Sequence, residues 1–160
     1  MGSSPHGMRM RLAGLILTVS VVFSLSSCRA RTEPAKTPLL GNRVADLARH
    51  LCGIPYRAGG DDVDGFDCSG LVSYVYGCYG VRLPREARAQ AKLKRKVPFD
   101  GAKPGDILIF RIKRTWHSAV FVGDNRFVHA PKGNALVRQE DLSPFWLDRL
   151  RSVIRISGAD

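Results

Sequence analysis

The octapeptide Gly-Phe-Asp-Cys-Ser-Gly-Leu-Val spans residues 65–72 and places a cysteine where a glycine-containing loop enters a predicted helix. Apolar residues continue at helical spacing to about Tyr79, and Gly80 is typical of a helix end. The first turn of a helix presents free N–H groups and the positive end of the helix dipole. Both features favour a thiolate and can stabilise an oxyanion, so Cys68 is the candidate nucleophile of the chain.

Helical and strand-like segments flank this stretch in a clear order. Before it, the pattern predicts a helix with Asn42 as its N-cap and Gly53 at its end, followed by a loop over residues 53–66. After it come a basic, partly helical stretch over residues 85–96 and then five short runs rich in Ile, Val and Phe. These predicted strands cover residues 106–112, 118–123, 126–130, 135–138 and 152–156. Helices followed by antiparallel strands predict an α+β domain.

Two histidines on neighbouring predicted strands are the candidate bases for Cys68. His117 begins the run 117–123, His129 lies at the end of the next run, and Asp124-Asn125 between them predicts a hairpin turn. Because side chains alternate along a strand, both rings can reach one face of the sheet. A nucleophilic thiol needs a base within hydrogen-bond reach, and that base needs an orienting partner. Zinc ligation by the same three residues is an alternative, but no closely spaced pair of ligands supports it.

The composition limits the class of protein. The chain has 160 residues, of which 44% are hydrophobic and 24% charged. These values fit one folded domain and exclude disordered, collagen-like and multi-pass membrane chains. The formal net charge of +11 favours polyanionic surroundings, such as nucleic acid, anionic lipid or a wall polymer. Export would separate the chain from nucleic acid, so we expect no nucleic-acid partner.

The N-terminal segment predicts export. Arg9 and Arg11 precede an uncharged stretch over residues 12–27, which is short for a membrane-spanning helix but typical of a signal peptide. It ends in Leu-Ser-Ser-Cys at residues 25–28, a sequence that resembles the lipobox of bacterial lipoproteins. On this interpretation residues 1–27 are a lipoprotein signal peptide, residues 28–40 are the lipidated Cys28 and a flexible tether, and residues 41–160 are the folded domain. The alternative is an ordinary signal anchor with a chance cysteine.

From Gly53 onward the chain resembles the NlpC/P60 family of papain-like cysteine peptidases. The segments that carry this resemblance are residues 53–60, 67–72, 83–85 with Gln90, 104–110, 117–123 and 127–130. Their order and spacing cover nearly all of the predicted domain, and the layout is similar to that of small lipoprotein members with a catalytic domain only. The resemblance implies N-terminal helices packed on an antiparallel sheet of about five to six strands.

The resemblance also implies a role for each site residue. Cys68 is the nucleophile, His117 is the general base, and His129 orients the ring of His117. Tyr56 assists the backbone N–H of Cys68 at the oxyanion site. Asp67 and Ser69 flank the nucleophile, and in family members these neighbours help to recognise the amino end of the stem peptide.

The activity implied is that of a peptidoglycan endopeptidase with an acyl-enzyme intermediate. The bond cut is γ-D-Glu–diaminopimelate or D-Ala–diaminopimelate, and no metal or organic cofactor is needed. The implied partners are peptidoglycan and, through lipidated Cys28, a membrane; we expect a monomer at the outer membrane facing the periplasm.

Two departures from the family pattern support an alternative function. Ala119 stands where the family often has glycine, and Ala58 stands where it often has tryptophan. These departures favour a catalytically weak or inactive wall-binding lipoprotein on the same fold as one alternative. The other alternative, a papain-like lipid acyltransferase or thioesterase, comes from the wider papain-like group and not from these two residues.

Other residues allow simpler interpretations. Cys52 and Cys78 either pair in an oxidising compartment or are small buried residues, and Phe145 and Trp146 are predicted to lie in the core. A basic cluster is either a dock for anionic headgroups or the wall, or a solvated surface. Its members are Arg82, Arg85, Arg88, Lys92, Lys94, Arg95 and Lys96.

Overall fold

The computed structural model describes residues 39–156. The helices are α1 (Leu40–His50), α2 (Cys68–Gly77), α3 (Ala87–Gln90) and α4 (Pro144–Arg149), with one 3-10 turn at Phe99–Gly101. The strands are β1 (Asp61–Asp62), β2 (Gly65–Phe66), β3 (Lys96–Val97), β4 (Ile107–Ile112), β5 (Thr115–Gly123), β6 (Arg126–His129), β7 (Arg138–Asp141) and β8 (Leu150–Ile154). The predicted signal peptide and most of the predicted tether, including Cys28, lie outside the described residues.

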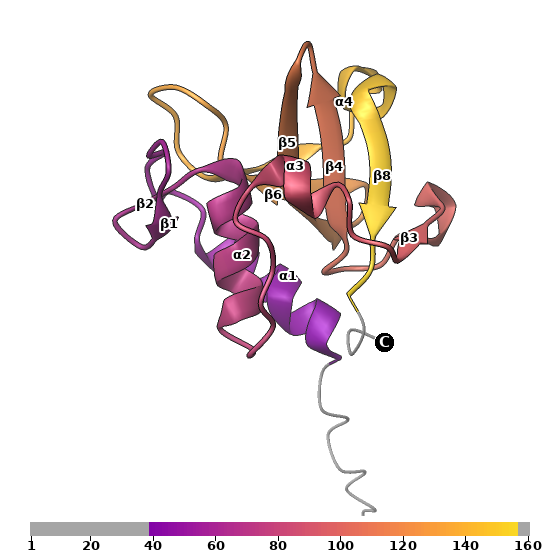
Figure 1. Ribbon diagram of the computed structural model, residues 1–160, viewed down its shortest axis with the longest axis horizontal. Coiled ribbons are helices and arrows are strands. Elements are labelled where there is room, and N and C mark those ends of the chain that lie inside the picture. The colour runs from indigo at the N-terminus through magenta and orange to yellow at the C-terminus, as the bar shows by residue number, and fades with distance from the viewer. Residues whose placement is uncertain (1–38, 157–160) are drawn as a thin grey trace, which may run out of the picture. The chain divides into compact units, whose positions relative to one another are not determined.

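Six strands form one antiparallel sheet in the order β3-β8-β4-β5-β6-β7. Strands β1 and β2 make a separate small hairpin. Helices α1 and α2 pack against each other and against β5, on one face of the sheet (Figure 1). The predicted α+β fold, with N-terminal helices on an antiparallel sheet of five to six strands, is confirmed.

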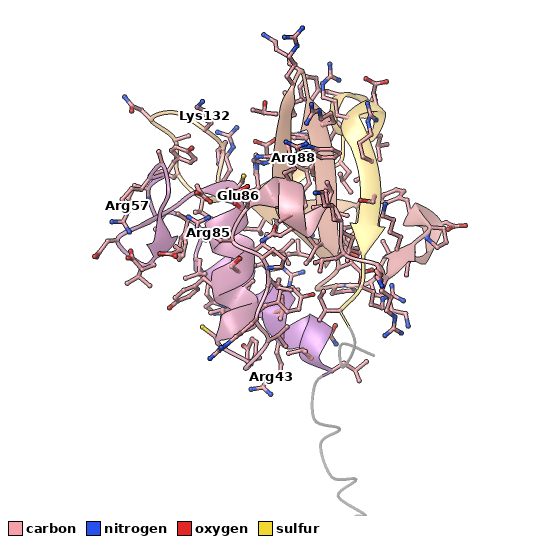
Figure 2. The ribbon with its side chains drawn as sticks, in the orientation of Figure 1. Arg43, Arg57, Arg85, Glu86, Arg88 and Lys132 are labelled. Carbon is pink, nitrogen blue, oxygen red and sulfur yellow. The ribbon has the colours of Figure 1, made fainter. Side chains whose placement is uncertain are left out.

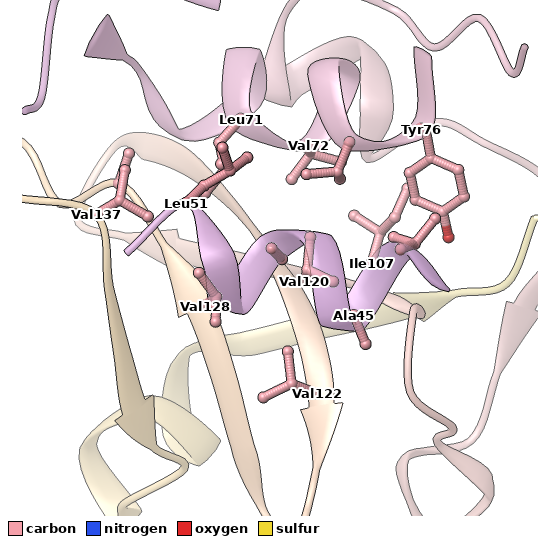
Figure 3. Close-up of a cluster of buried hydrophobic side chains, with 14 of the residues drawn as sticks. Ala45, Leu51, Leu71, Val72, Tyr76, Ile107, Val120, Val122, Val128 and Val137 are labelled. Carbon is pink, nitrogen blue, oxygen red and sulfur yellow. The ribbon is translucent and has the colours of Figure 1, made fainter. Parts of the chain in front are cut away.

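Both faces of the sheet are buried, which explains why β4 is a continuous apolar run instead of an alternating one. Ile107 and Ile109 point toward the helices and join a core with side chains of α1 and α2 (Figure 3). Leu108 and Phe110 point the opposite way and pack in a second cluster. Val120, Val122 and Val128 share the first face, whereas Ala119, Phe121 and Phe127 share the second. Odd-numbered residues of β5 and β6 therefore face the second cluster.

The hairpin between β5 and β6 has the predicted turn. Asp124 and Asn125 have φ angles of 50° and 56°, so both adopt the left-handed conformation that a two-residue turn of type I′ requires. Asparagine and aspartate tolerate this conformation better than other non-glycine residues. Beyond this turn the register shifts by one residue, from Gly123 opposite Arg126 to Phe121 opposite Phe127, and this shift brings the odd-numbered residues of both strands to one face.

Several predicted boundaries are wrong. Helix α1 begins at Leu40, inside the predicted tether, so Asn42 lies in its first turn and is not the cap. The strand predicted at residues 135–138 starts instead at Arg138, because the backbone of Ala135 and Val137 bonds to the loop at Ile54 and Tyr56. Strand β3, the β1–β2 hairpin and α4 were not predicted, since segments of two to six residues are too short for a periodic pattern.

The described cysteines Cys52, Cys68 and Cys78 are all free, which contradicts the alternative in which Cys52 and Cys78 form a disulfide. Both of these residues are exposed, and the alternative that they are buried is wrong too. Between residues 39 and 156, no helix has the length and apolar character to cross a membrane.

Candidate active site

One cleft of about 920 Å³ brings together all six domain residues that the sequence predicted for the site. Its walls come from the loop before α2, from α2 and α3, from β5 and β6, and from the segment around α4. The predicted members that line it are Tyr56, Asp67, Cys68, Ser69, His117 and His129.

The start of α2 positions Cys68, the candidate nucleophile. Asp67 is the N-cap, and its Oδ1 accepts a hydrogen bond of 2.7 Å from the backbone N–H of Gly70. Cys68 is therefore the first residue of the helix, where backbone N–H groups have no partner within the helix. The N–H groups of Cys68 and Ser69, and that of Ser118 on β5, reach the sulfur. The contact with Ser118 places the sulfur against β5, at the residue that follows His117 in the chain.

The pKa of the Cys68 thiol is raised, not lowered as the helix start predicted. Burial is the largest cause, and the nearby Asp67 carboxylate raises the pKa further. The hydrogen bonds from backbone N–H groups lower it but do not offset burial. Cys68 is therefore a thiol near neutral pH.

Alkylation of Cys68 by iodoacetamide should therefore speed up continuously as the pH rises from 7 to 9. Only the thiolate reacts, and a raised pKa keeps the thiolate a minor species over this range. The rate is measured on the full chain by mass spectrometry of the peptide that carries Cys68, which separates it from the other cysteines. A rate that is already at its plateau at pH 7 would show a preformed thiolate instead.

The two histidines meet on the face of the sheet opposite α1 and α2. The pairing of Phe121 with Phe127 places His117 and His129 on the same side of the β5–β6 hairpin, as predicted. His117 Nε2 lies 2.8 Å from His129 Nδ1, and the rings are nearly perpendicular, at 87°. Because Nε2 is occupied, Nδ1 is the nitrogen of His117 left to act on Cys68.

Both rings are neutral at ordinary pH. Burial, assisted by the neighbouring His129, lowers the pKa of His117 to about 3. Burial also lowers the pKa of His129, although the carboxylate of Glu140 acts in the opposite direction. His117 therefore holds a free lone pair that can accept a proton.

The sequence did not predict two contributors to the site, Glu140 and Trp146. Trp146 was assigned to the core, but it is half-buried, stacks on His117 at 5.9 Å between ring centroids and lines the cleft. Phe145 is 51% exposed, so its assignment to the core is wrong. Glu140 lies on β7 behind His129. Because the sequence predicted this strand at residues 135–138, Glu140 fell outside it and was not assigned to the site.

Arg85 belongs to the site and not to a free basic surface. Its Nη1 donates to Oδ1 of Asp67 at 2.9 Å, and its Nη2 donates to Oδ2 at 2.8 Å. Burial raises the pKa of Asp67, but these hydrogen bonds and that from Gly70 leave it below its ordinary value. The Asp67 carboxylate is therefore ionised, and the guanidinium of Arg85 balances its charge.

The buried side chain of Gln90 fixes the segment that carries Arg85. Its Nε2 donates to the backbone oxygens of Ser69 and Pro84 and lies 3.1 Å from Oγ of Ser73. These bonds join α3 to the first turns of α2. Ser69, 5% exposed, donates its hydroxyl to Oδ1 of Asp67 at 3.1 Å, so it supports the cap beside the nucleophile.

Tyr56 keeps its hydroxyl proton at the edge of the cleft. Burial is the main cause of its raised pKa, and the nearby Cys68 and Asp67 add to it. A protonated phenol is a hydrogen-bond donor. The Tyr56 hydroxyl is therefore available to a negatively charged oxygen near Cys68.

The mouth of the cleft carries an excess of positive charge. Arg88, Arg114 and Lys132 line it, are exposed and make no ion pair with the described residues, and Glu86 is the one unpaired acid beside them. In Figure 2, Arg85, Glu86 and Arg88 lie at the N-terminal end of α3, and Lys132 lies on the loop after β6. Among residues 39–156, no three His, Cys, Asp or Glu side chains are grouped so that they could hold a metal ion together.

Comparison with known proteins places these features in a family. The sequence pattern of the NlpC/P60 family matches residues 53–155 of the chain. The Escherichia coli protein named murein DD-endopeptidase MepS/murein LD-carboxypeptidase is 30% identical over 117 residues, which are 72% of this chain and 62% of that protein. The chain thus spans less than two thirds of this relative's length.

Two further comparisons agree. The gamma-D-glutamyl-L-lysine dipeptidyl-peptidase of Bacillus subtilis is 38% identical over 93 residues, which cover 56% of this chain and 31% of that one. The crystal structure of the NlpC/P60 domain of the peptidoglycan hydrolase SagA superposes with a TM-score of 0.64 at 29% identity. It covers 72% of this chain and 98% of the SagA chain.

Proposed function

The chain belongs to the NlpC/P60 family, and from that premise we propose that it is a cysteine endopeptidase acting on the stem peptides of peptidoglycan. One observation carries the proposal: Cys68, His117 and His129 line a single cleft, and the histidines are joined at 2.8 Å so that Nδ1 of His117 is left for the thiol. This arrangement supplies a nucleophile, a base and an orienting group.

Acylation begins with neutral Cys68 and neutral His117. Nδ1 of His117 takes the thiol proton as the sulfur attacks the carbonyl carbon of the scissile peptide bond. The carbonyl oxygen becomes an oxyanion, stabilised by the backbone N–H of Cys68 and the hydroxyl of Tyr56. When the intermediate collapses, His117 returns the proton to the departing amine, and the acyl group stays on sulfur as a thioester.

Deacylation reverses the roles. His117 takes a proton from water, and the hydroxide attacks the thioester carbonyl. Collapse of the second tetrahedral intermediate releases the stem-peptide carboxyl group, and the proton on His117 goes back to the sulfur of Cys68. These reaction steps need no metal or organic cofactor.

The charges of the cleft favour a substrate with carboxylates over one with a free amino end. Arg85 already neutralises Asp67, which weakens that residue as a partner for an ammonium group. The three unpaired cations at the mouth suit the carboxylates of D-Glu and diaminopimelate. We propose that the bond cut lies in intact wall, at γ-D-Glu–diaminopimelate or D-Ala–diaminopimelate.

Removing two of these cations should impair cleavage of carboxylate substrates selectively. In an Arg88→Gln/Arg114→Gln variant, kcat/KM for a stem peptide with free carboxylates should fall about fivefold, since each exposed charge pair contributes under 1 kcal/mol. For the amidated peptide it should stay unchanged. Lys94→Gln, which removes an exposed cation outside the cleft, is the matched control. Equal effects on both peptides would reject recognition of carboxylates.

Defined muropeptides test the function and identify the bond. A cross-linked dimer and its uncross-linked monomer are incubated with the purified chain, and the products are identified by mass spectrometry. Conversion of dimer to monomers identifies the D-Ala–diaminopimelate bond, whereas loss of the distal residues from the monomer identifies γ-D-Glu–diaminopimelate. Binding of both without cleavage would favour the wall-binding alternative.

We also propose that the protein reaches the cell envelope as a lipoprotein. The basic residues Arg9 and Arg11, the uncharged stretch over residues 12–27 and the Leu-Ser-Ser-Cys sequence support export and lipidation at Cys28. The absence of aspartate after Cys28 favours the outer membrane, and the catalytic domain would then face the periplasm.

A further inference from the structure

A carboxylate contacts the nitrogen of His129 that does not face His117. Oε1 of Glu140 is 3.2 Å from Nε2 of His129, an ion-pair distance, although the contact does not have the geometry of a good hydrogen bond. His129 is 1% exposed and the Glu140 side chain 23%, so water competes weakly for this contact. The polar atoms thus form a series that runs from Glu140 through His129 to His117, and the backbone N–H of Ser118, the next residue, reaches the sulfur of Cys68.

Two side chains hold Glu140 in place. The indole Nε1 of Trp146 donates to Oε2 at 2.8 Å, and Nε and Nη2 of Arg138 contact Oε1. Trp146 also stacks on His117 and meets His129 edge-on, with ring centroids 5.9 Å and 5.2 Å apart. The indole therefore fixes the carboxylate and both imidazoles together.

The positions of the protons follow from the donor and acceptor properties of these groups. A carboxylate only accepts, so the nitrogen of His129 that faces Glu140 is favoured as N–H. In a neutral ring the other nitrogen, Nδ1, then carries the lone pair and accepts from Nε2–H of His117. His117 in turn has its lone pair on Nδ1, which is the nitrogen left to take the proton of Cys68.

We propose that Glu140 is a positioning residue that fixes the tautomers of both His129 and His117 and so makes Nδ1 of His117 the base. This inference deepens the proposed function and depends on it, because it assigns the origin of the basicity of His117. Without the carboxylate, the opposite arrangement is possible: Nδ1–H of His129 donates to His117, and Nδ1 of His117 carries a proton and cannot accept one.

Glu140 also favours the charged state that forms during attack. Its carboxylate faces His129 on β6, Arg138 on its own strand and, at longer range, His117 on β5. Burial raises the pKa of Glu140, but the hydrogen bonds from Arg138 and Trp146 leave it below the ordinary value. The group is therefore an anion throughout the working pH range, and it stabilises the imidazolium of the transition state.

The tautomers can be read directly in the full chain labelled with 15N-histidine, which contains four histidines. The nitrogen chemical shifts of the wild-type protein should show Nε2–H and bare Nδ1 for both His117 and His129. In Glu140→Gln, the side-chain amide can donate to His129, and both rings should shift toward Nδ1–H. Nδ1–H on either histidine of the wild type would overturn the inference, whether or not the protein is active.

Kinetics give a second readout with matched variants. Glu140→Gln should lower kcat/KM for the cross-linked muropeptide about a hundredfold, the range of a lost proton-transfer group, mainly through kcat. Glu140→Asp, which keeps an acceptor, should recover part of the loss. Glu86→Gln, which removes a carboxylate of the cleft that does not contact a histidine, should leave the tautomers unchanged. Unchanged tautomers and activity within threefold in a folded Glu140→Gln protein would also overturn the inference.

Failure of the proposed function would give other experimental results than failure of the inference about Glu140. A wild-type protein that cleaves no muropeptide would reject the endopeptidase, while the tautomers would remain measurable. Altered tautomers without altered kcat/KM would show that the carboxylate orders the rings but does not act on the base, which overturns the inference alone.

Discussion

Exchange of Cys68 for serine is expected to lower kcat/KM for a cross-linked muropeptide by about a thousandfold or more. A serine hydroxyl is a much weaker acid than a thiol, and burial lowers the pKa of His117 to about 3, so the base is too weak to activate it. Binding of the muropeptide should survive, because the exchange changes one atom of the side chain. Initial rates and equilibrium binding measured on both proteins test the two parts separately.

Cys78→Ser is the matched control, since this free cysteine is exposed and lies outside the cleft. Its activity should equal that of the wild type. A Cys68→Ser protein that retains a tenth of the wild-type activity would show that another residue provides the nucleophile.

The second large effect is expected from Gly70→Ala, which should destabilise the fold by about 3 kcal/mol or more and inactivate it. A Cβ atom at Gly70 would lie 2.0 Å from the backbone oxygen of Gly60. Neither partner is a flexible side chain, so the start of α2 or the loop at Gly60 must move, and Cys68 moves with it. Urea denaturation followed by circular dichroism gives the change in the free energy of unfolding.

Gly77→Ala provides the comparison on the same helix. A Cβ atom there meets nothing within 4 Å, and alanine is favoured over glycine in a helix by up to about 1 kcal/mol. This variant should be as stable as the wild type or more stable. Equal stability of the two variants would contradict the close contact between Gly70 and Gly60.

The placement of Cys68 at a helix start, and of the histidines on two neighbouring strands, could be predicted from the sequence because local patterns position them. Asp67 and the glycines around it mark the start of α2, and Asp124-Asn125 fixes a two-residue turn. Alternation along the two strands brings His117 and His129 to one face because the register also shifts by one residue between Phe121 and Gly123, and the sequence did not indicate that shift. The helix start and the turn depend on residues close together in the chain.

The surroundings of the pair could not be predicted, because contacts distant in sequence decide them. The backbone of Ala135 and Val137 bonds to the loop at Ile54 and Tyr56, and this delays β7 until Arg138. Because β7 begins at Arg138, the carboxylate of Glu140 lies next to His129 and accepts a hydrogen bond from the indole of Trp146. The hydrophobic pattern of residues 131–149 does not indicate these contacts.

The raised pKa of Cys68 also could not be predicted from the local sequence. The helix start does provide N–H groups to the sulfur, as the sequence indicated, but burial between α2 and β5 outweighs them. Burial depends on the packed structure. The role of Arg85 also depends on the packed structure. Its basic neighbours in the sequence suggested a surface cluster, but the fold brings its guanidinium to Asp67.

Purified sacculi give the most direct test of the central claim that the protein is a peptidoglycan endopeptidase. The full chain is incubated with them, and the released material is identified by mass spectrometry. We predict soluble fragments that end at a new γ-D-Glu or D-Ala carboxyl group and at a new amine of diaminopimelate, and none of them with Cys68→Ala. Sacculi that bind the wild-type protein but release no fragments, or fragments that appear equally with Cys68→Ala, would contradict it.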